Sequence, residues 1–419
     1  MSEPVYRRCC GMDIHKDTIV VCVLARDGET GAAVRKTYRT FRGDLVRMRT
    51  WLKLLKVSEI AMESTGVYWR TVWNVLEEQG FVLLLVNPAQ VKALQGRKSD
   101  ARDARRIAEF LQDRRLDASF VPPPEMRQLR ELLRQRLSLV QQRGEVQNQI
   151  RDLFETASLK FGSVASDLMG VTGRRIIEAL IAGEDSAERL SWKVKGRLRK
   201  KEKEVKESLK GYFNDFHRML LSAYYRHYQF LTEAIAGFER EVEQRMAPHA
   251  EKVALLMGIP GVERLIAWHL IAELGVDMSV FADAAHCASW AGLSPGTCES
   301  AGKQFSGRTK KGNKYLRRVL TQAAWAASRC KDGYLRAFFH RVKSRRGWSR
   351  AVVATAHKIL LIAFSILRTG TPYQDLGGDY FDRLHPERTA RRLVQRLERL
   401  GLEVTVTPAH HPSTRFQDS

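Results

Sequence analysis

The sequence is poor in cysteine, and the few it has argue against both a disulfide framework and a zinc site. Six cysteines occur in 419 residues, no C-x-x-C pair is present, and Cys9 and Cys10 are neighbours, which seldom bridge each other. The chain shows no charged-then-apolar leader, and no apolar run approaches the roughly 20 residues that span a bilayer. We therefore expect a reducing, cytoplasmic location and no membrane partner.

Acidic residues are also scarce relative to basic ones. The chain has 47 Asp and Glu against 70 Lys and Arg, which gives a formal charge of +23 and a pI near 10.0. This imbalance favours a polyanionic partner, because bound phosphates release their counterions; a merely basic soluble protein is the alternative. Single hydrophobic cores stop growing at about 250–300 residues, so the length predicts two or three domains.

Four carboxylates in three short motifs are the most informative feature. G-M-D-I-H-K at 11–16 carries Asp13, A-M-E-S-T-G at 61–66 carries Glu63, and S-D-A-R-D at 99–103 carries Asp100 and Asp103. A D-x-x-D spacing usually belongs to a solvated helix face. Four acids from separate segments, however, are what a site with two Mg²⁺ ions about 3.5–4 Å apart requires for phosphoryl transfer.

Residues 1–122 predict a mixed α/β domain. The pattern indicates a β-hairpin over 5–25, further strands over 33–41, 60–63 and 81–86, helices over 45–55 and 68–79, and a helix capped by Ser99 that ends before the prolines at 122–124. This order places Asp13 and Glu63 at neighbouring strand ends.

Residues 123–250 predict a long helical or coiled-coil arm. Apolar residues recur at helical spacing from Leu129 to Leu153, with a register shift near Gly144, and again from Phe216 to Val242, a stripe in which His227 is expected to pack. An antiparallel hairpin that mediates dimerisation and an ordinary bundle both satisfy this pattern. The mixed-charge run at 193–210 is typical of a solvated face, yet it offers a positive patch to nucleic acid.

Residues 251–370 predict a mostly helical domain. M-G-I-P-G-V at 257–262 before a helix resembles half of a helix-hairpin-helix, which exposes N–H groups to a DNA phosphate; a plain helix connection is the alternative. Residues 371–419 form a small appendage with a helix over 391–400, a strand over 402–406 and a disordered tail beyond Pro408.

A hydroxyl-rich loop and a basic turn inside this domain suit a phosphodiester. W-A-G-L-S-P-G-T-C-E-S-A-G-K at 290–303 is followed by S-G-R-T-K-K-G-N-K-Y-L-R-R at 306–318. The residues expected to contact nucleic acid are Lys303, Arg308, Lys310, Lys311, Asn313, Lys314, Arg317 and Arg318, together with Arg197, Arg199 and Lys200 from the arm.

These motifs resemble the DEDD transposases of insertion sequences, a family related to the Piv-type DNA invertases. The resemblance covers residues 8–115 and 252–330. It implies a RuvC-like, ribonuclease-H-type N-terminal domain in which Asp13, Glu63, Asp100 and Asp103 bind Mg²⁺. It also implies that Ser300, in S-A-G-K, is the nucleophile of the C-terminal domain, and that a structured RNA encoded by the element pairs with donor and target DNA.

The expected function is therefore DNA transposition through a phosphoserine intermediate. We expect a homo-oligomer, a dimer or a dimer of dimers, at the bacterial nucleoid, with its active site completed between protomers. The alternatives are a RuvC-like nuclease that only hydrolyses DNA, with Ser300 as a turn residue, and a nucleic-acid-binding protein with an inactive acid set. A Piv-type site-specific invertase would use the same protein chemistry.

Overall fold

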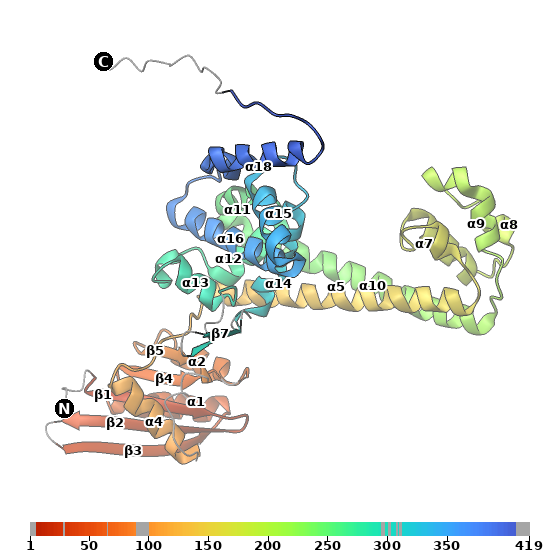
Figure 1. Ribbon diagram of the computed structural model, residues 1–419. Helices are drawn as coiled ribbons and strands as arrows, with labels where there is room; N and C mark the ends of the chain where they lie inside the picture. Colours follow the sequence, from red (N-terminus) through yellow and green to blue (C-terminus); the bar gives the residue numbers. More distant parts are fainter. Residues whose placement is uncertain are drawn as a thin grey trace. The chain divides into compact units, whose positions relative to one another are not determined.

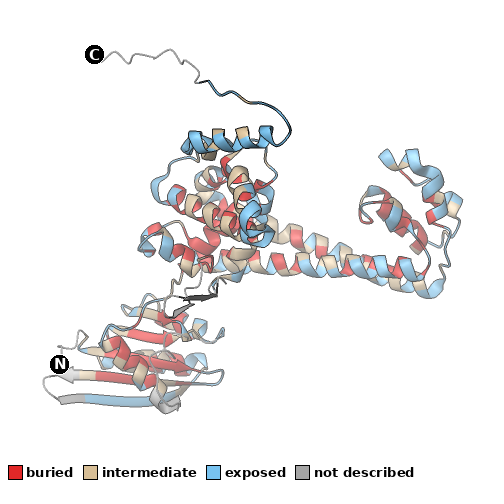
Figure 2. Cartoon of the chain, viewed as in Figure 1, coloured by how far each residue is buried: buried red, intermediate tan, exposed pale blue. Residues whose placement is uncertain are grey.

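The chain forms two compact units, Met1–Val121 and Pro122–Ser419 (Figures 1 and 2). The structure, a computed structural model, describes residues 6–27, 30–64, 66–88, 100–294, 298–300, 303–306, 309 and 312–407. The first unit is mixed α/β and the second is almost entirely helical, which confirms the predicted combination of fold classes.

Unit 1 contains a five-stranded sheet in the order β3-β2-β1-β4-β5. Three strands form an antiparallel meander, and the last two lie parallel to β1: β1 (Arg8–Ile14), β2 (Thr18–Asp27), β3 (Thr30–Arg39), β4 (Glu59–Glu63) and β5 (Val82–Val86). The predicted strands are all present, although the third begins at residue 30 rather than 33. The central strands β1 and β2 are buried on both faces, whereas most of the described residues of the edge strand β3 are exposed.

Helices cover both faces of this sheet. Cys10, Met12 and Ile14 of β1 pack against α1 (Arg42–Leu54) and α2 (Trp69–Leu76) in one hydrophobic core. The alternate residues of β1 face α4 (Asp100–Gln112), whose apolar side chains form a second core with Cys9. In Figure 1, α4 crosses one face of the sheet along β1 and β2.

The position of α4 depends on the missing side chain of Gly11. A Cβ atom at this residue would lie 2.2 Å from the carbonyl oxygen of Ala104 and 2.4 Å from the amide nitrogen of Ala108. Farther along, the Cys9 thiol donates a hydrogen bond to the Ala108 carbonyl (3.5 Å), and Gln112 donates to the Tyr6 carbonyl (3.3 Å). The helix therefore runs antiparallel to β1, and its N-terminal turn lies at the carboxyl end of that strand.

Unit 2 begins with two long helices that pair along their length, α5 (Pro124–Thr156) and α10 (Asp215–Met246). A helix of about 33 residues spans roughly 50 Å. Arg136 pairs with Glu239 at 2.6 Å across the two helices, and Arg245 donates to Gln128 at 2.6 Å. A pair of long helices was predicted, and α5 starts at the third proline, a favoured position at a helix N-terminus.

The predicted register of α10 is wrong in its first half. Leu221 and Tyr225 are buried there, whereas Phe216 is 60% exposed and His227 is exposed, not packed in the stripe. The reason is a separate hydrophobic core, the tip core, formed around the end of α5 and the start of α10. There Tyr225 donates a 2.7 Å hydrogen bond to Glu178. The helix turns a different face to that core. The expected register shift at Gly144 leaves α5 unbroken.

Four short helices and a 3-10 turn complete the tip core of the α5–α10 arm. They are α6 (Phe161–Val164), α7 (Val171–Ile181), α8 (Ala187–Ser191), η1 (Gly196–Lys201) and α9 (Glu202–Ser208). Their apolar residues enclose one cluster with the ends of α5 and α10. The charge run at 193–210 is thus partly structured, with η1 at the surface.

The remainder of unit 2 is a helical bundle with one small hairpin. Its elements are η2 (Ala247–His249), α11 (Ala250–Met257), α12 (Arg264–Leu274), η3 (Met278–Val280), α13 (Ala284–Trp290), β6 (Cys298–Ser300), β7 (Lys303–Ser306), α14 (Lys314–Ala327), α15 (Tyr334–Arg346), α16 (Trp348–Thr369), α17 (Tyr380–Leu384) and α18 (Pro386–Glu398). The strand predicted over 402–406 is wrong, since residues 402–407 have no regular structure. The tail beyond Pro408 lies outside the described residues.

The turn between α11 and α12 packs against α14. Gly261 has φ = 85°, and a Cβ atom there would lie 2.4 Å from the Ala323 carbonyl oxygen. The glycine therefore serves a close approach of two backbones. The phosphate contact expected of a helix-hairpin-helix at this turn stays a prediction.

One described helix, α16, is long and apolar enough to cross a membrane by length and composition. The expectation that no apolar run approaches this length is therefore wrong. Half of the apolar stretch is buried, and the helix packs against α13, α14 and α15. Its composition thus reflects its position in the core of the bundle.

Replacing Gly11 by alanine is expected to loosen α4 from the sheet. The new Cβ would meet two backbone atoms that cannot move away separately, so we expect unit 1 to lose about 2 kcal/mol of stability or more. Gly144→Ala is the control, because nothing lies within 4 Å of a Cβ at that helical position. Hydrogen exchange of the β1 and α4 peptides measures the effect. Equal protection in both variants would contradict it.

Candidate active site

Two acids meet at the carboxyl ends of adjacent parallel strands. The parallel register pairs Met12 of β1 with Met62 of β4. Asp13 and Glu63 each follow a residue of this pair, so they lie side by side at the strand ends. Both point to the face that α4 covers, because they alternate with the residues of the opposite core. Ligands commonly bind at such strand ends in α/β sheets.

A third acid comes from the first turn of α4. Asp103 precedes Ala104, whose carbonyl lies over Gly11, so the helix brings Asp103 towards the end of β1. Asp13 is 8% exposed, and burial raises the pKa of its carboxyl group, with a further increase from the negative charges of Glu63 and Asp103. Asp13 is therefore within the electrostatic influence of both other carboxylates.

The fourth predicted acid, Asp100, lies in the same helix, three residues before Asp103. Its side chain lies outside the described part of the structure, as does its predicted cap, Ser99. The spacing still places Asp100 and Asp103 on one face of α4.

His15 is a neighbour of the cluster that the sequence alone did not single out. Its Nε2 atom lies 3.2 Å from Oδ2 of Asp13, and this contact opposes the rise in the pKa of Asp13. The imidazole is half exposed, and its backbone N–H closes the turn by donating to the Thr18 carbonyl at 2.9 Å. The sequence does carry one indication of this contact: His15 follows Asp13 by two residues, and this spacing puts both side chains on one side of an extended chain.

The donor chemistry of this cluster fits a hard divalent cation. Carboxylate oxygens are the ligands that Mg²⁺ accepts in proteins, and burial, with a smaller contribution from the charges of Glu63 and Asp103, raises the pKa of Asp13. Among the side chains that the structure describes, no three His, Cys, Asp or Glu residues gather as a ready-made metal site. The acids therefore fit Mg²⁺ in the type of their ligand atoms and in their charge.

Ser300, the predicted nucleophile, ends a short strand of unit 2. It pairs with Lys303 in the β6–β7 hairpin, which the sequence did not predict, and its side chain lies outside the description. The ends of the surrounding loop are held together. Asn313 N–H donates to the Trp290 carbonyl at 3.4 Å, and a Cβ at Gly312 would lie 2.3 Å from the amide nitrogen of Gly292. The loop between α13 and α14 is thus closed at its base.

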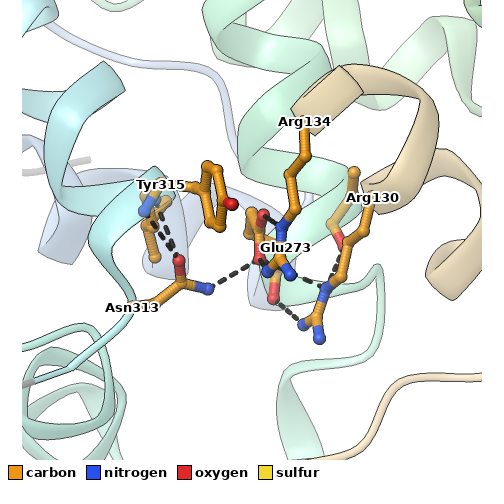
Figure 3. Close-up of polar contacts among 7 residues, drawn as sticks. Arg130, Arg134, Glu273, Asn313 and Tyr315 are labelled. Carbon is orange, nitrogen blue, oxygen red and sulfur yellow. Dashed lines mark hydrogen bonds and ion pairs between the residues drawn. The ribbon is translucent and has the colours of Figure 1, made fainter. Parts of the chain in front are cut away.

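A buried glutamate anchors this base (Figure 3). Glu273 in α12 is 1% exposed and receives two hydrogen bonds from Arg134 of α5, at 2.9 and 2.8 Å. Arg130 lies 3.3 Å away, and the Asn313 amide donates at 2.6 Å. Burial alone would raise the pKa of Glu273, but the bond from Arg134 and the charges of both arginines lower it.

Asn313 joins this network to the start of α14. Its Oδ1 accepts from the backbone amides of Tyr315 and Leu316, both at 3.1 Å, as a helix N-cap. The Arg134 guanidinium stacks on Tyr315, 4.3 Å from the ring centre. The sequence analysis did not predict the roles of Arg130, Arg134 and Glu273. The position of Glu273 inside an apolar helix is one indication, because a buried acid requires a partner.

The other residues expected to contact nucleic acid are distributed between the arm and α14. Arg197, Arg199 and Lys200 are exposed in η1, and Lys314 is exposed at the start of α14. Arg318 is half-buried, and Arg317 donates to the Thr309 hydroxyl at 2.7 Å. Arg308, Lys310, Lys311 and the side chain of Lys303 lie outside the described residues. Their role stays a prediction.

Glu273→Gln is expected to destabilise unit 2, because it leaves two half-buried arginines without their countercharge. Breaking a buried ion pair on one side costs about 3–5 kcal/mol. The pKa of Glu273 is lowered in the fold, so its contribution is complete above the ordinary glutamate range and is lost as pH falls through the lowered value. Denaturant unfolding at several pH values should show the gap between variant and wild type closing in acid. Glu263→Gln, at the exposed cap of the same helix, should change little.

Two family models match the chain. A DEDD model of the IS110 type, described as a transposase, matches residues 10–158, and a model described as "Transposase IS116/IS110/IS902 family" matches residues 253–340. The first match contains Asp13, Glu63, Asp100 and Asp103, and the second contains Ser300 and the closed loop. The two matches therefore lie on the segments that carry the candidate site.

Several curated proteins resemble the chain over most of their length. A "Probable family 20 transposase" of Pseudomonas aeruginosa is 25% identical over 78% of this chain and 89% of its own. The "Transposase for insertion sequence element IS1111A" of Coxiella burnetii is 27% identical over 87% and 90%, and that for IS1328 of Yersinia enterocolitica is 24% identical over 87% and 97%. With both models matched, the chain belongs to the IS110-type DEDD family of insertion-sequence transposases.

Proposed function

We propose that this transposase cuts and rejoins DNA through a phosphoserine intermediate on Ser300, with Asp13, Glu63, Asp100 and Asp103 as ligands of Mg²⁺. The observation that carries the proposal is that the buried carboxyl group of Asp13 lies at one edge of the sheet within the electrostatic influence of Glu63 and Asp103; burial raises its pKa most, and these two acids raise it further. A mixed sheet with carboxylates at the ends of two parallel strands also supports a RuvC-like, ribonuclease-H-type fold for unit 1.

The acids would act as ligands and not as nucleophiles. Two bound Mg²⁺ ions would supply charge stabilisation for the attacking and leaving oxygens of a phosphodiester. Asp13 contributes a carboxylate whose orientation His15 supports through the 3.2 Å contact. Gly11 contributes indirectly, since only its bare backbone lets α4 approach with Asp100 and Asp103.

Ser300 would supply the covalent step. Its Oγ attacks phosphorus, an O–P bond forms, and the bond from phosphorus to the leaving sugar oxygen breaks; that oxygen keeps the electron pair and takes up a proton. Attack by the hydroxyl of a new strand then releases the serine, so the bond energy is conserved. The closed base of the loop, held by Asn313 and Glu273, supports this role because it restricts the nucleophile to a small region.

The partners we propose are donor and target DNA and a structured RNA encoded by the element, in a bacterial homo-oligomer at the nucleoid. The charge of +23 supports a partnership with nucleic acids. The acids belong to unit 1 and Ser300 to unit 2. A dimer or dimer of dimers, with the α5–α10 arm as its contact, would bring the two halves of a composite site together. A Piv-type invertase would require the same protein chemistry.

Ser300→Ala should abolish a covalent protein–DNA adduct while leaving DNA binding unchanged. The adduct is measured by denaturing gel after incubation with end-labelled donor DNA and Mg²⁺. Ser294→Ala and Ser306→Ala are matched controls in the same loop and should retain it. An adduct that persists without Ser300 would transfer the role to one of them. Cleavage by the wild type with no adduct would favour the purely hydrolytic nuclease.

Asp13→Asn should stop strand cleavage and yet stabilise unit 1 in the absence of Mg²⁺. A carboxyl group whose pKa is raised on folding favours the fold when protonated, so its ionised form costs stability as pH rises through the raised value. We therefore expect a higher unfolding temperature than the wild type at neutral pH. Added Mg²⁺ should raise the temperature of the wild type much more than that of the variant. An equal Mg²⁺ response in both would exclude Asp13 as a ligand.

A further inference from the structure

A cationic cavity lies in the C-terminal part of unit 2, outside the segments that the family models match. Its volume is about 510 Å³, and α15, α17, α18 and the turn before α18 line it. Within the described part of the chain, the lining contains no acidic residue and five arginines: Arg341, Arg345, Arg388, Arg391 and Arg392. The second family match ends at residue 340, immediately before the first of these.

Hydrogen bonds outside the lining hold the chain that leads to the cavity. Asp375 accepts hydrogen bonds from the backbone amides of Tyr334 at 2.9 Å and Gly377 at 2.8 Å, and from the Tyr373 hydroxyl at 3.1 Å. These bonds fold the chain after α16 back onto the start of α15. Phe381 of α17 then stacks on Tyr334, with ring centres 5.5 Å apart. The cavity is therefore built by packing and hydrogen bonds.

Much of the positive charge around it has no counterpart. Arg391 lies 3.9 Å from Glu387 and Arg392 lies 3.6 Å from Asp382, so these two are paired at long range. The Arg341 guanidinium lies over the Phe381 ring at 5.0 Å. Among the described residues, no ion pair joins Arg345 or Arg388 to a carboxylate, and both arginines line the cavity, from α15 and α18 respectively.

Guanidinium groups on two walls favour a ligand with several anionic oxygens. Arginine presents donors in a planar fork that matches phosphate in a bidentate manner. The hydroxyls of Ser344 and Thr389 and the Phe381 ring add polar and flat surfaces to the same lining. The cavity volume of about 510 Å³ is many times the roughly 30 Å³ that one water molecule occupies in the liquid, so the cavity has room for a ligand of several heavy atoms. A sugar-phosphate segment satisfies both the size and the charge.

We propose that this cavity binds the phosphodiester backbone of a nucleic acid, and that it is an anchoring site separate from the catalytic one. The inference does not depend on Ser300 or on the acids of unit 1. DNA and RNA share the backbone chemistry, so the experiment distinguishes them.

The test compares two double variants of the full-length chain with the same loss of charge. Arg345→Gln with Arg388→Gln removes one arginine from each wall of the cavity. Arg396→Gln with Arg399→Gln, outside the lining, is the matched control. Affinities for a random-sequence duplex DNA and for an RNA hairpin are measured over a series of salt concentrations. Hydrogen exchange of α15 and α18 verifies that each variant is folded.

The cavity variant should bind at least one probe roughly tenfold more weakly, and the slope of log affinity against log salt should fall by about 1 to 2. The control should retain the wild-type slope, and the more affected probe identifies the ligand as DNA or RNA. Equal losses in the two variants would reduce the effect to surface charge and overturn the proposal. Protection of α18 by inorganic phosphate, with unchanged nucleic-acid binding, would instead assign the cavity to a free anion.

Discussion

The arrangement of unit 1 depends on one contact, the approach of the α4 backbone to Gly11. Any side chain at this position would overlap Ala104 and Ala108. The contact sets the height of the helix above the sheet and its direction along β1. Its N-terminal turn consequently brings Asp103 to the level where Asp13 and Glu63 end their strands. A constraint of backbone packing thus determines where the negative charge of the site accumulates.

Unit 2 has a comparable node in Glu273. Its carboxylate connects α5 through Arg134, and the cap of α14 through Asn313. These contacts neutralise the buried carboxylate of Glu273, which would otherwise lower the stability of the fold. It also fixes three elements that are far apart in the sequence around the base of the loop that carries Ser300.

Local patterns explain what the sequence could predict. Short runs of strand-forming residues predicted the strands around Asp13 and Glu63, and the apolar periodicity of α5 and α10 predicted the long pair. Predictions failed where distant contacts decide the outcome. The tip core decides which face of α10 is buried in its first half, where Tyr225 bonds to Glu178. The arginine partners of Glu273 lie 139 residues or more from it along the chain. The segment 402–406 has strand-forming residues but no neighbouring strand to pair with in the described structure.

The closed base of the loop between α13 and α14 has a consequence for the energetics of folding. Joining two points that are distant along the chain lowers its conformational entropy, and here the Trp290–Asn313 hydrogen bond and the contact of Gly292 with Gly312 make such a closure on folding. That entropic loss is therefore already included in the stability of the bundle.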